Sequence, residues 1–178
     1  MRKRKAWLGC LWLLMICLLA AGCGKDARLK DIQENILSVK KNGKIEEYLV
    51  EKLDKDYYSA EALESYIDSE AEAVQGVSVK DFSVESDMAR AEIHYDDPES
   101  FLAFNGQAIT ICKLSEADAQ DISLATEGSV PDDGYVIVTE FETRLIGPGD
   151  PVAWSEDVSV SEDGICRTTA KRCVMIYK

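Results

Sequence analysis

The first 23 residues determine which part of the chain is left to fold and in which compartment it folds. Residues 2–5 are four consecutive cations, and an apolar run over residues 6–21 then ends in small residues just before Cys23. A positive start, an apolar segment and small residues at the cleavage site are the three parts of a secretory signal. The cations stay in the cytoplasm, because moving each Lys or Arg into hydrocarbon costs about 2.5–3.5 kcal/mol on insertion scales. The sequence therefore predicts that residues 1–22 are a signal peptide and that the rest is exported.

The end of this run also predicts a lipid anchor. Leu19, Ala20, Ala21 and Gly22 precede Cys23, and these residues resemble the lipoprotein signal of bacteria, in which a diacylglyceryl group is attached to a cysteine that becomes the first residue of the mature chain. Ala20 departs from the commonest form, which has leucine there, but a small residue is tolerated. The resemblance implies that Cys23 is the lipid attachment site, and that the protein is held on the extracytoplasmic side of the cell membrane. Acyl chains, at about 0.8 kcal/mol for each buried CH2 group, make such an anchor stable.

An uncleaved transmembrane helix is the alternative to a cleaved signal. A spanning helix needs about 20 apolar residues, and residues 6–22 fall short of this before the polar Lys25 and Asp26. The short run favours cleavage, and in both cases the rest of the chain lies outside the cytoplasm.

The exported part of the chain is strongly acidic. The sequence has 20 Lys and Arg against 33 Asp and Glu, and four of the basic residues but none of the acids lie in residues 1–22, so the chain from Cys23 carries a formal net charge of −17. Nucleic acid is excluded as a partner, because its binding requires clustered Lys and Arg. Anionic lipid headgroups would also repel the domain. The charge favours a cationic ligand or another envelope protein.

The exported length suits a single domain. A chain near 150 residues buries about 68–70% of its unfolded surface, which is enough for one hydrophobic core without disulfide bonds. We expect residues 23–34 to be the lipidated cysteine with a short tether and residues 35–178 to be one domain. This length is too short for the two-lobed solute receptors of transport systems.

Three cysteines remain beyond Cys23, so at most one disulfide bond can form within the domain. Cys166 and Cys173 are the candidate pair, because they could face each other across a hairpin that turns at Thr169 and Ala170 in an oxidising compartment. The alternative is that they are buried, unpaired thiols, which fill a core as small hydrophobic side chains.

Residues 35–53 form two partly alternating runs around a turn, which predicts a β-hairpin. A two-residue loop would pair Val39 with Glu46, whereas a three-residue loop with Gly43 in the left-handed conformation would pair Val39 with Ile45. The second register puts two apolar side chains on one face, so the pattern favours the three-residue loop.

Residues 54–75 carry apolar side chains at helical spacing, with Ser59 as a candidate N-cap and Gly76 as a candidate stop. The expected outward face is almost entirely acidic, so packing of the apolar stripe must hold this helix in place. The acidic residues are Glu61, Glu64, Asp68, Glu70 and Glu72.

The rest of the chain predicts further strands and two short helices. Strands at residues 77–84 and 88–95 are expected, with Arg90, Glu92 and His94 on a water-facing side. Asp97 and Pro98 begin one helix, which Asn105 and Gly106 end, and Ser115 caps another that reaches residue 121. The remaining expected strands span residues 109–113, 134–146, 152–160, 165–167 and 174–177, with a loop at residues 126–133.

This order of elements predicts an α+β fold with a mainly antiparallel sheet, in which an N-terminal β-hairpin is followed by one amphipathic helix and two short helices. Several stretches also resemble one protein family: VKKNGKIEEYLVEKLDKDYYSAEALESYIDSE at residues 39–70, FNG at residues 104–106, and the closing SEDVSVSEDG and MIYK. They are similar to small, uncharacterised surface lipoproteins of anaerobic, clostridial-type Gram-positive bacteria. The resemblance implies the same fold and compartment, and it implies no activity.

No complete catalytic set stands out in the sequence. His94 is the only histidine, and no motif links it to a nucleophile, so we interpret it as a surface residue. A metal site that adds Asp96 and Asp97 to it is a weaker alternative. Trp154, with Tyr57 and Tyr58, could form a binding platform, but large aromatic side chains in so small a domain are mostly core.

Residues 54–65 partly match a 12-residue calcium-binding loop. However, Ser59 stands where the loop needs glycine, and Ser65 stands where it needs a bidentate glutamate. An irregular calcium site could still use acids from the expected loops, Asp132, Asp133 or Asp150.

These observations predict a lipid-anchored extracytoplasmic module that binds an envelope protein or a cationic ligand, with no cofactor and no catalysis. Two alternatives stay open. A carboxylate-based envelope hydrolase would need two acids with raised pKa values in one cleft, and a calcium-stabilised surface module would need oxygen ligands from separate loops.

Overall fold

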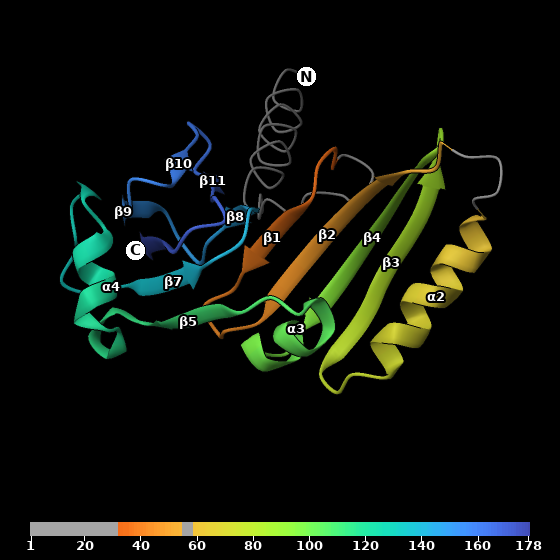
Figure 1. Ribbon diagram of the computed structural model, residues 1–178, viewed down its shortest axis with the longest axis horizontal. Coiled ribbons are helices and arrows are strands. Elements are labelled where there is room, and N and C mark those ends of the chain that lie inside the picture. The colour runs from red at the N-terminus through yellow and green to blue at the C-terminus, as the bar shows by residue number, and fades with distance from the viewer. Residues whose placement is uncertain (1–31, 55–58) are drawn as a thin grey trace, which may run out of the picture.

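The computed structural model describes residues 32–54 and 59–178 (Figure 1). Residues 1–31, which include Cys23, lie outside the described part, and so do Tyr57 and Tyr58. The described chain forms two mostly antiparallel β-sheets and three α-helices. This confirms the expected α+β class, although the strands are divided between two sheets.

The larger sheet has seven strands, and its neighbouring strands are antiparallel except for β1 and β8, which are parallel. In spatial order they are β10 (Ser159–Val160), β11 (Cys166–Arg167), β8 (Arg144–Ile146), β1 (Ile36–Val39), β2 (Ile45–Lys52), β4 (Met88–Tyr95) and β3 (Val77–Glu85). The smaller sheet is antiparallel throughout, in the order β5 (Ile109–Lys113), β7 (Tyr135–Thr139), β12 (Cys173–Tyr177), β9 (Pro151–Trp154) and β6 (Glu127–Gly128).

The first two helices begin at the caps that the sequence predicts. In α2 (Ala60–Glu72) the Ser59 hydroxyl accepts a hydrogen bond from the Ala62 N–H. In α3 (Pro98–Asn105) Asp97 and Ser100 form a capping box, and Gly106 ends the helix in the left-handed conformation at φ 67°. Figure 1 shows α2 beside β3 at one end of the molecule and α4 (Ala119–Leu124) at the other.

The N-terminal hairpin has the register that the apolar pattern favours. Val39 pairs with Ile45, and the Lys40 N–H donates to the Lys44 carbonyl at 2.9 Å, so residues 41–43 are the loop. Gly43 has φ 82° with nothing within 4 Å of a built Cβ, so its backbone conformation and not its size requires glycine. The three-residue loop is confirmed.

The strand pair β3–β4 is also confirmed, but one side of β4 is less exposed than expected. The odd-numbered residues of β4 from Ala89 to Tyr95 are buried, as the alternation predicts. Arg90, on the other side, is 6% exposed, because its Nε donates a hydrogen bond to the Ile32 carbonyl at 2.8 Å. The prediction of a fully water-facing side was therefore wrong at Arg90.

The prediction of one long strand over residues 134–146 was wrong. The chain leaves the smaller sheet after β7 and enters the larger sheet as β8. Thr168 holds the connection: its hydroxyl donates to the Phe141 carbonyl at 2.7 Å and accepts from the Thr143 N–H at 3.0 Å. These side-chain hydrogen bonds satisfy backbone groups that a continuous ladder would otherwise have used.

Three neighbouring predictions also need correction. Residues 152–160 are divided between β9 and β10, which belong to different sheets. The helix expected to start at Ser115 is instead a 3-10 turn over Leu114–Glu116, followed by α4, whose cap is Asp118. The loop expected at residues 126–133 contains the short strand β6.

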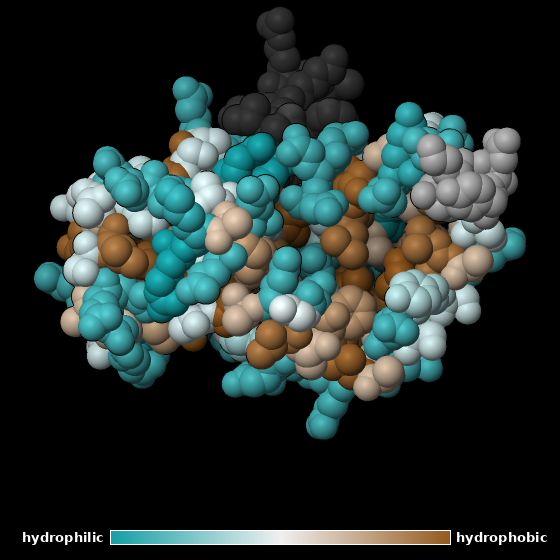
Figure 2. Space-filling model, viewed as in Figure 1, coloured by the Kyte–Doolittle hydropathy of each residue, from teal (hydrophilic) through white to brown (hydrophobic). Residues whose placement is uncertain are grey.

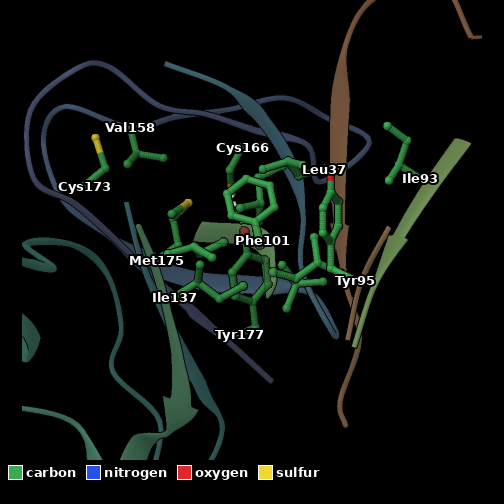
Figure 3. Packing of buried hydrophobic residues seen from close by; sticks show 14 of the residues in the cluster. Leu37, Ile93, Tyr95, Phe101, Ile137, Val158, Cys166, Cys173, Met175 and Tyr177 are labelled. Carbon is green, nitrogen blue, oxygen red and sulfur yellow. Dashed lines mark hydrogen bonds between the residues drawn. The ribbon is translucent and has the colours of Figure 1, made fainter. Parts of the chain in front are cut away.

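The main hydrophobic core lies between the two sheets (Figure 3). Phe101 of α3 is buried there with side chains of the larger sheet, such as Leu37 and Tyr95, and of the smaller sheet, such as Ile137 and Met175. A second cluster on the other side of the smaller sheet lies under the half-buried Ile122 of α4. Side chains of both sheets therefore share the main core.

Candidate functional site

The exposed side of α2 is a continuous acidic surface. Its apolar residues at positions 63, 67, 71 and 74 recur at helical spacing and turn toward the sheet, which leaves the acids in water. One open depression is lined by Glu61, Glu64, Ser65, Asp68, Ser69 and Glu72. We call its four carboxylates, Glu61, Glu64, Asp68 and Glu72, the acidic face. Within the described residues none of them forms an ion pair, so their charge is directed to solvent.

An apolar groove lies beside the same helix, between α2 and the larger sheet. Its apolar lining comes from α2 and from all three neighbouring strands, and it encloses about 250 Å³. Figure 2 shows apolar side chains gathered in a strip next to the helix. We call this feature the α2 groove, and its principal apolar residues are Leu49, Leu63, Tyr66, Ile67, Phe82 and Ala91.

The register of the sheet explains why acids stand next to this groove. Leu49 of β2 is paired with Ala91 of β4, which is paired with Phe82 of β3, so these three side chains share a face. Side chains on a strand alternate, so Glu47 and Glu51 lie on the same face as Leu49. Glu51 lines the groove directly.

Of these two acids, Glu47 is the one whose carboxylate is largely buried and hydrogen-bonded within the protein. Its Oε2 accepts a hydrogen bond from the Tyr95 hydroxyl, and the Asn105 Nδ2 donates to the Tyr95 oxygen at 3.0 Å and to the Glu47 Oε2 at 3.4 Å. Burial raises the pKa of Glu47, and the two hydrogen bonds lower it by less. Burial and the nearby Glu47 charge raise the pKa of Tyr95 far above its usual value, so Tyr95 stays a hydrogen-bond donor at any ordinary pH.

Sequence reasoning missed this cluster of Glu47, Tyr95 and Asn105, although two signals were present. Glu47 stands between Ile45 and Leu49 in a strand, so alternation alone places it on the apolar side. Asn105 belongs to the FNG stretch, which we interpreted only as the end of a helix. The charge of Glu47 and the turn-forming character of Asn105 obscured both signals.

His94 lies on the opposite side of β4, away from the α2 groove. It is partly exposed, and its Nε2 is 2.5 Å from Glu92 Oε1. No Ser or Cys side chain is among its hydrogen-bond partners in the described structure.

The hairpin proposed to join Cys166 and Cys173 was wrong. Cys166 is in β11 of the larger sheet and Cys173 is in β12 of the smaller sheet. Both cysteines are free thiols, and each has its own partners: Tyr177 donates to the Cys166 sulfur at 3.1 Å, and the Thr169 N–H donates to the Cys173 sulfur at 3.4 Å. The structure therefore contains no bridge between them.

The residues proposed for calcium, Asp132, Asp133 and Asp150, do not form a metal site in the described part of the chain. No group of three or more His, Cys, Asp or Glu side chains within residues 32–54 and 59–178 could hold a metal ion. Asp133 is 3.5 Å from the Lys178 ammonium, and the Asp150 N–H and carbonyl both pair with Lys178 backbone groups. Residues 54–65, which partly match a calcium-binding loop, are only partly described.

The proposed aromatic platform is not formed by Trp154. Its half-buried side chain packs against the main core, as the alternative interpretation expected. Its two suggested partners lie outside the described residues.

The first described residues, Ile32 to Asn35, are held against the rest of the structure by polar contacts. Ile32 is held through its carbonyl by Arg90, and Glu34 Oε2 is 3.0 Å from an Arg144 nitrogen. Asn35 accepts a hydrogen bond from the Val50 N–H at 2.8 Å. If Cys23 is anchored, eight residues lie between it and Ile32, so Ile32 lies within about 30 Å of the anchor.

In the part of the chain that the structure describes, no helix is long and apolar enough to cross a membrane. Comparisons with protein-family models, with curated proteins and with solved structures find no match to this chain.

Proposed function

We propose that this protein is a lipid-anchored module on the extracytoplasmic side of the cell membrane, which binds a cationic partner, most simply another envelope protein, through the acidic face of α2. The observation that carries the proposal is the exposure of four carboxylates on one side of a single helix, none of which forms an ion pair with another described residue. A surface of one sign raises the encounter rate with partners of the opposite sign and repels the wrong ones.

The sequence supports the location and the mode of attachment. The cations, the apolar run and the small residues before Cys23 have the form of a lipoprotein signal. The resemblance to clostridial-type surface lipoproteins agrees with it. A domain whose net charge is strongly negative would remain in solution next to an anionic membrane while its anchor keeps it close.

The hydrolase alternative has one observation in its favour, the raised pKa of the Glu47 carboxyl. Glycoside hydrolysis requires a second carboxyl across a substrate cleft. The side-chain partners of Glu47 are instead the Tyr95 phenol and the Asn105 amide. Binding is therefore the better-supported function.

Crosslinking of the full-length lipidated protein in its native host tests the proposal. The variant Glu61→Lys, Glu64→Lys, Asp68→Lys should lose the partner that the wild-type protein captures. A control variant, Asp132→Lys, Glu156→Lys, Glu162→Lys, changes the net charge by the same amount at exposed positions outside α2 and should keep it. Equal capture by both variants would mean that the acidic face is not the binding surface.

A further inference from the structure

We propose that the α2 groove is the docking site for a Lys- or Arg-rich segment of a partner protein that carries one aromatic or branched aliphatic anchor residue. The inference rests on the proposed function, since it takes the same cationic partner, and it adds the chemistry of the contact. The anchor side chain enters the groove, and the flanking cations lie over the surrounding carboxylates.

The groove has the size and lining of an anchor pocket. Its volume of about 250 Å³ exceeds the roughly 150 Å³ of an apolar cavity that can hold benzene. Leu49, Phe82 and Ala91 form its floor on the sheet, and Leu63 and Ile67 form its helical wall. The groove is therefore large enough for a phenylalanine or leucine side chain.

Tyr66 marks the open rim of the groove. It is 62% exposed, the highest value among the large hydrophobic side chains of the described chain, and it lines the groove from α2. Exposed aromatic side chains are enriched in protein interfaces, because they contribute a large contact area at a small cost in conformational entropy.

The charge around the groove selects a cationic segment. Glu51 lines the groove on the strand side, and the acidic face continues the negative surface on α2. Arg90 also lines the groove, but it is nearly buried and its Nε is engaged by the Ile32 carbonyl. The α2 groove therefore combines an apolar centre with carboxylates beside it.

The same charge argues against other occupants. A second copy of this chain would bring a domain of net charge −17 against an acidic surface, which like-charge repulsion opposes. Anionic lipid headgroups meet the same repulsion. A basic peptide segment is the occupant that satisfies both the apolar lining and the carboxylates.

Two matched peptides test the proposal with the full-length lipidated protein in phosphatidylcholine nanodiscs. One has a single phenylalanine between two runs of lysines, and the other has serine in its place. Titration calorimetry, with empty nanodiscs as the reference, should show at least about tenfold tighter binding of the phenylalanine peptide. Equal affinities would overturn the groove as the anchor site and leave electrostatic binding by the acidic face intact.

Variants locate the contact. Tyr66→Ala should weaken binding of the phenylalanine peptide several-fold without changing binding of the serine peptide. Leu102 is an exposed apolar residue of α3 that does not line the groove, so Leu102→Ala should change the affinity of neither peptide. Tyr66 is exposed, so its removal leaves the fold intact. An unchanged phenylalanine-peptide affinity in Tyr66→Ala, or crosslinking of two copies that this substitution abolishes, would overturn the proposal.

Discussion

The Tyr95 hydroxyl donates a hydrogen bond to the Glu47 carboxylate in the interior side of the larger sheet, and the Asn105 amide binds both groups. The Tyr95 ring is held in place by the rings of Phe101 and Phe104, at centroid distances of 5.1 and 5.8 Å. A carboxyl group is thus fixed next to an apolar core by a phenol and an amide. This arrangement makes the stability of the domain depend on pH.

Glu47→Gln should stabilise the domain at neutral pH. The folded state raises the pKa of Glu47 through burial, so the folded protein binds a proton more readily than the unfolded chain does. The stability from this group is complete below the unfolded pKa, near 4.5, and is lost as the pH rises through the folded pKa. Glutamine keeps an acceptor for Tyr95 and carries no charge. Denaturant unfolding should show a larger gain at pH 7 than at pH 4.5.

Glu51→Gln is the matched control for that measurement, because Glu51 lies on the same face of β2 but is exposed. It should change the stability little at either pH. If Glu47→Gln were destabilising at pH 7, or if its effect did not vary with pH, the argument from burial of the charge would be wrong.

Tyr95→Phe should cost about 1–3 kcal/mol of unfolding free energy at pH 7, because it removes the donor to a buried carboxylate and leaves the ring packing in place. Tyr177→Phe is the comparison, since that buried hydroxyl donates to the neutral Cys166 sulfur. It should cost less than Tyr95→Phe in the same chemical denaturation. The reverse order would show that Glu47 does not depend on Tyr95.

The sequence was informative where a residue's conformation is set by its neighbours in the chain. The hairpin register followed from alternation and Gly43, and the start of α3 followed from Asp97 and Pro98, as the pairing of Val39 with Ile45 and the capping box confirm. Each of these depends on hydrogen bonds within a few residues, which local patterns encode.

The sequence was uninformative where the conformation or exposure of a residue depends on a group far away in the chain. Residues 134–146 read as one strand because the partner that interrupts the ladder, Thr168, lies beyond them in the sequence. Arg90 read as exposed because its acceptor, the Ile32 carbonyl, is 58 residues away. The α2 groove has the same origin, since its walls come from β2, α2, β3 and β4 and become one surface only when they pack together.

Cys23→Ser should prevent lipid attachment to the full-length protein in its native host. The lipoprotein signal requires a thiol at this position, and a hydroxyl cannot replace it. Metabolic labelling with a radioactive fatty acid should mark the wild-type protein and a Cys17→Ser control, whose cysteine lies inside the apolar run, but not Cys23→Ser. Undiminished labelling of Cys23→Ser would place the lipid on another residue, and an unlabelled wild-type protein would remove the anchor from the proposal.

The thiols of Cys166 and Cys173 should remain free in the exported protein. Each is buried in a different sheet with its own hydrogen-bond partner, and burial raises the pKa of the Cys166 thiol, which disfavours the reactive thiolate. Alkylation should therefore be slow in the native protein and should modify both cysteines in denaturant without a reductant. Mass spectrometry that finds this pair modified only after reduction would contradict the separation seen in the structure.

Thr139→Val should stabilise the domain by about 1 kcal/mol. Thr139 is 1% exposed, and its hydroxyl is the buried side-chain polar atom without a hydrogen-bond partner in the described structure. Valine has nearly the same shape and leaves no polar atom to desolvate.

Thr168→Val is the matched control, because the Thr168 hydroxyl binds two backbone groups of the connection between β7 and β8. It should destabilise by about 1–3 kcal/mol, since it leaves those groups unsatisfied. Opposite signs in thermal or denaturant unfolding are the expected result; destabilisation by both substitutions would mean that Thr139 has a partner, such as a buried water.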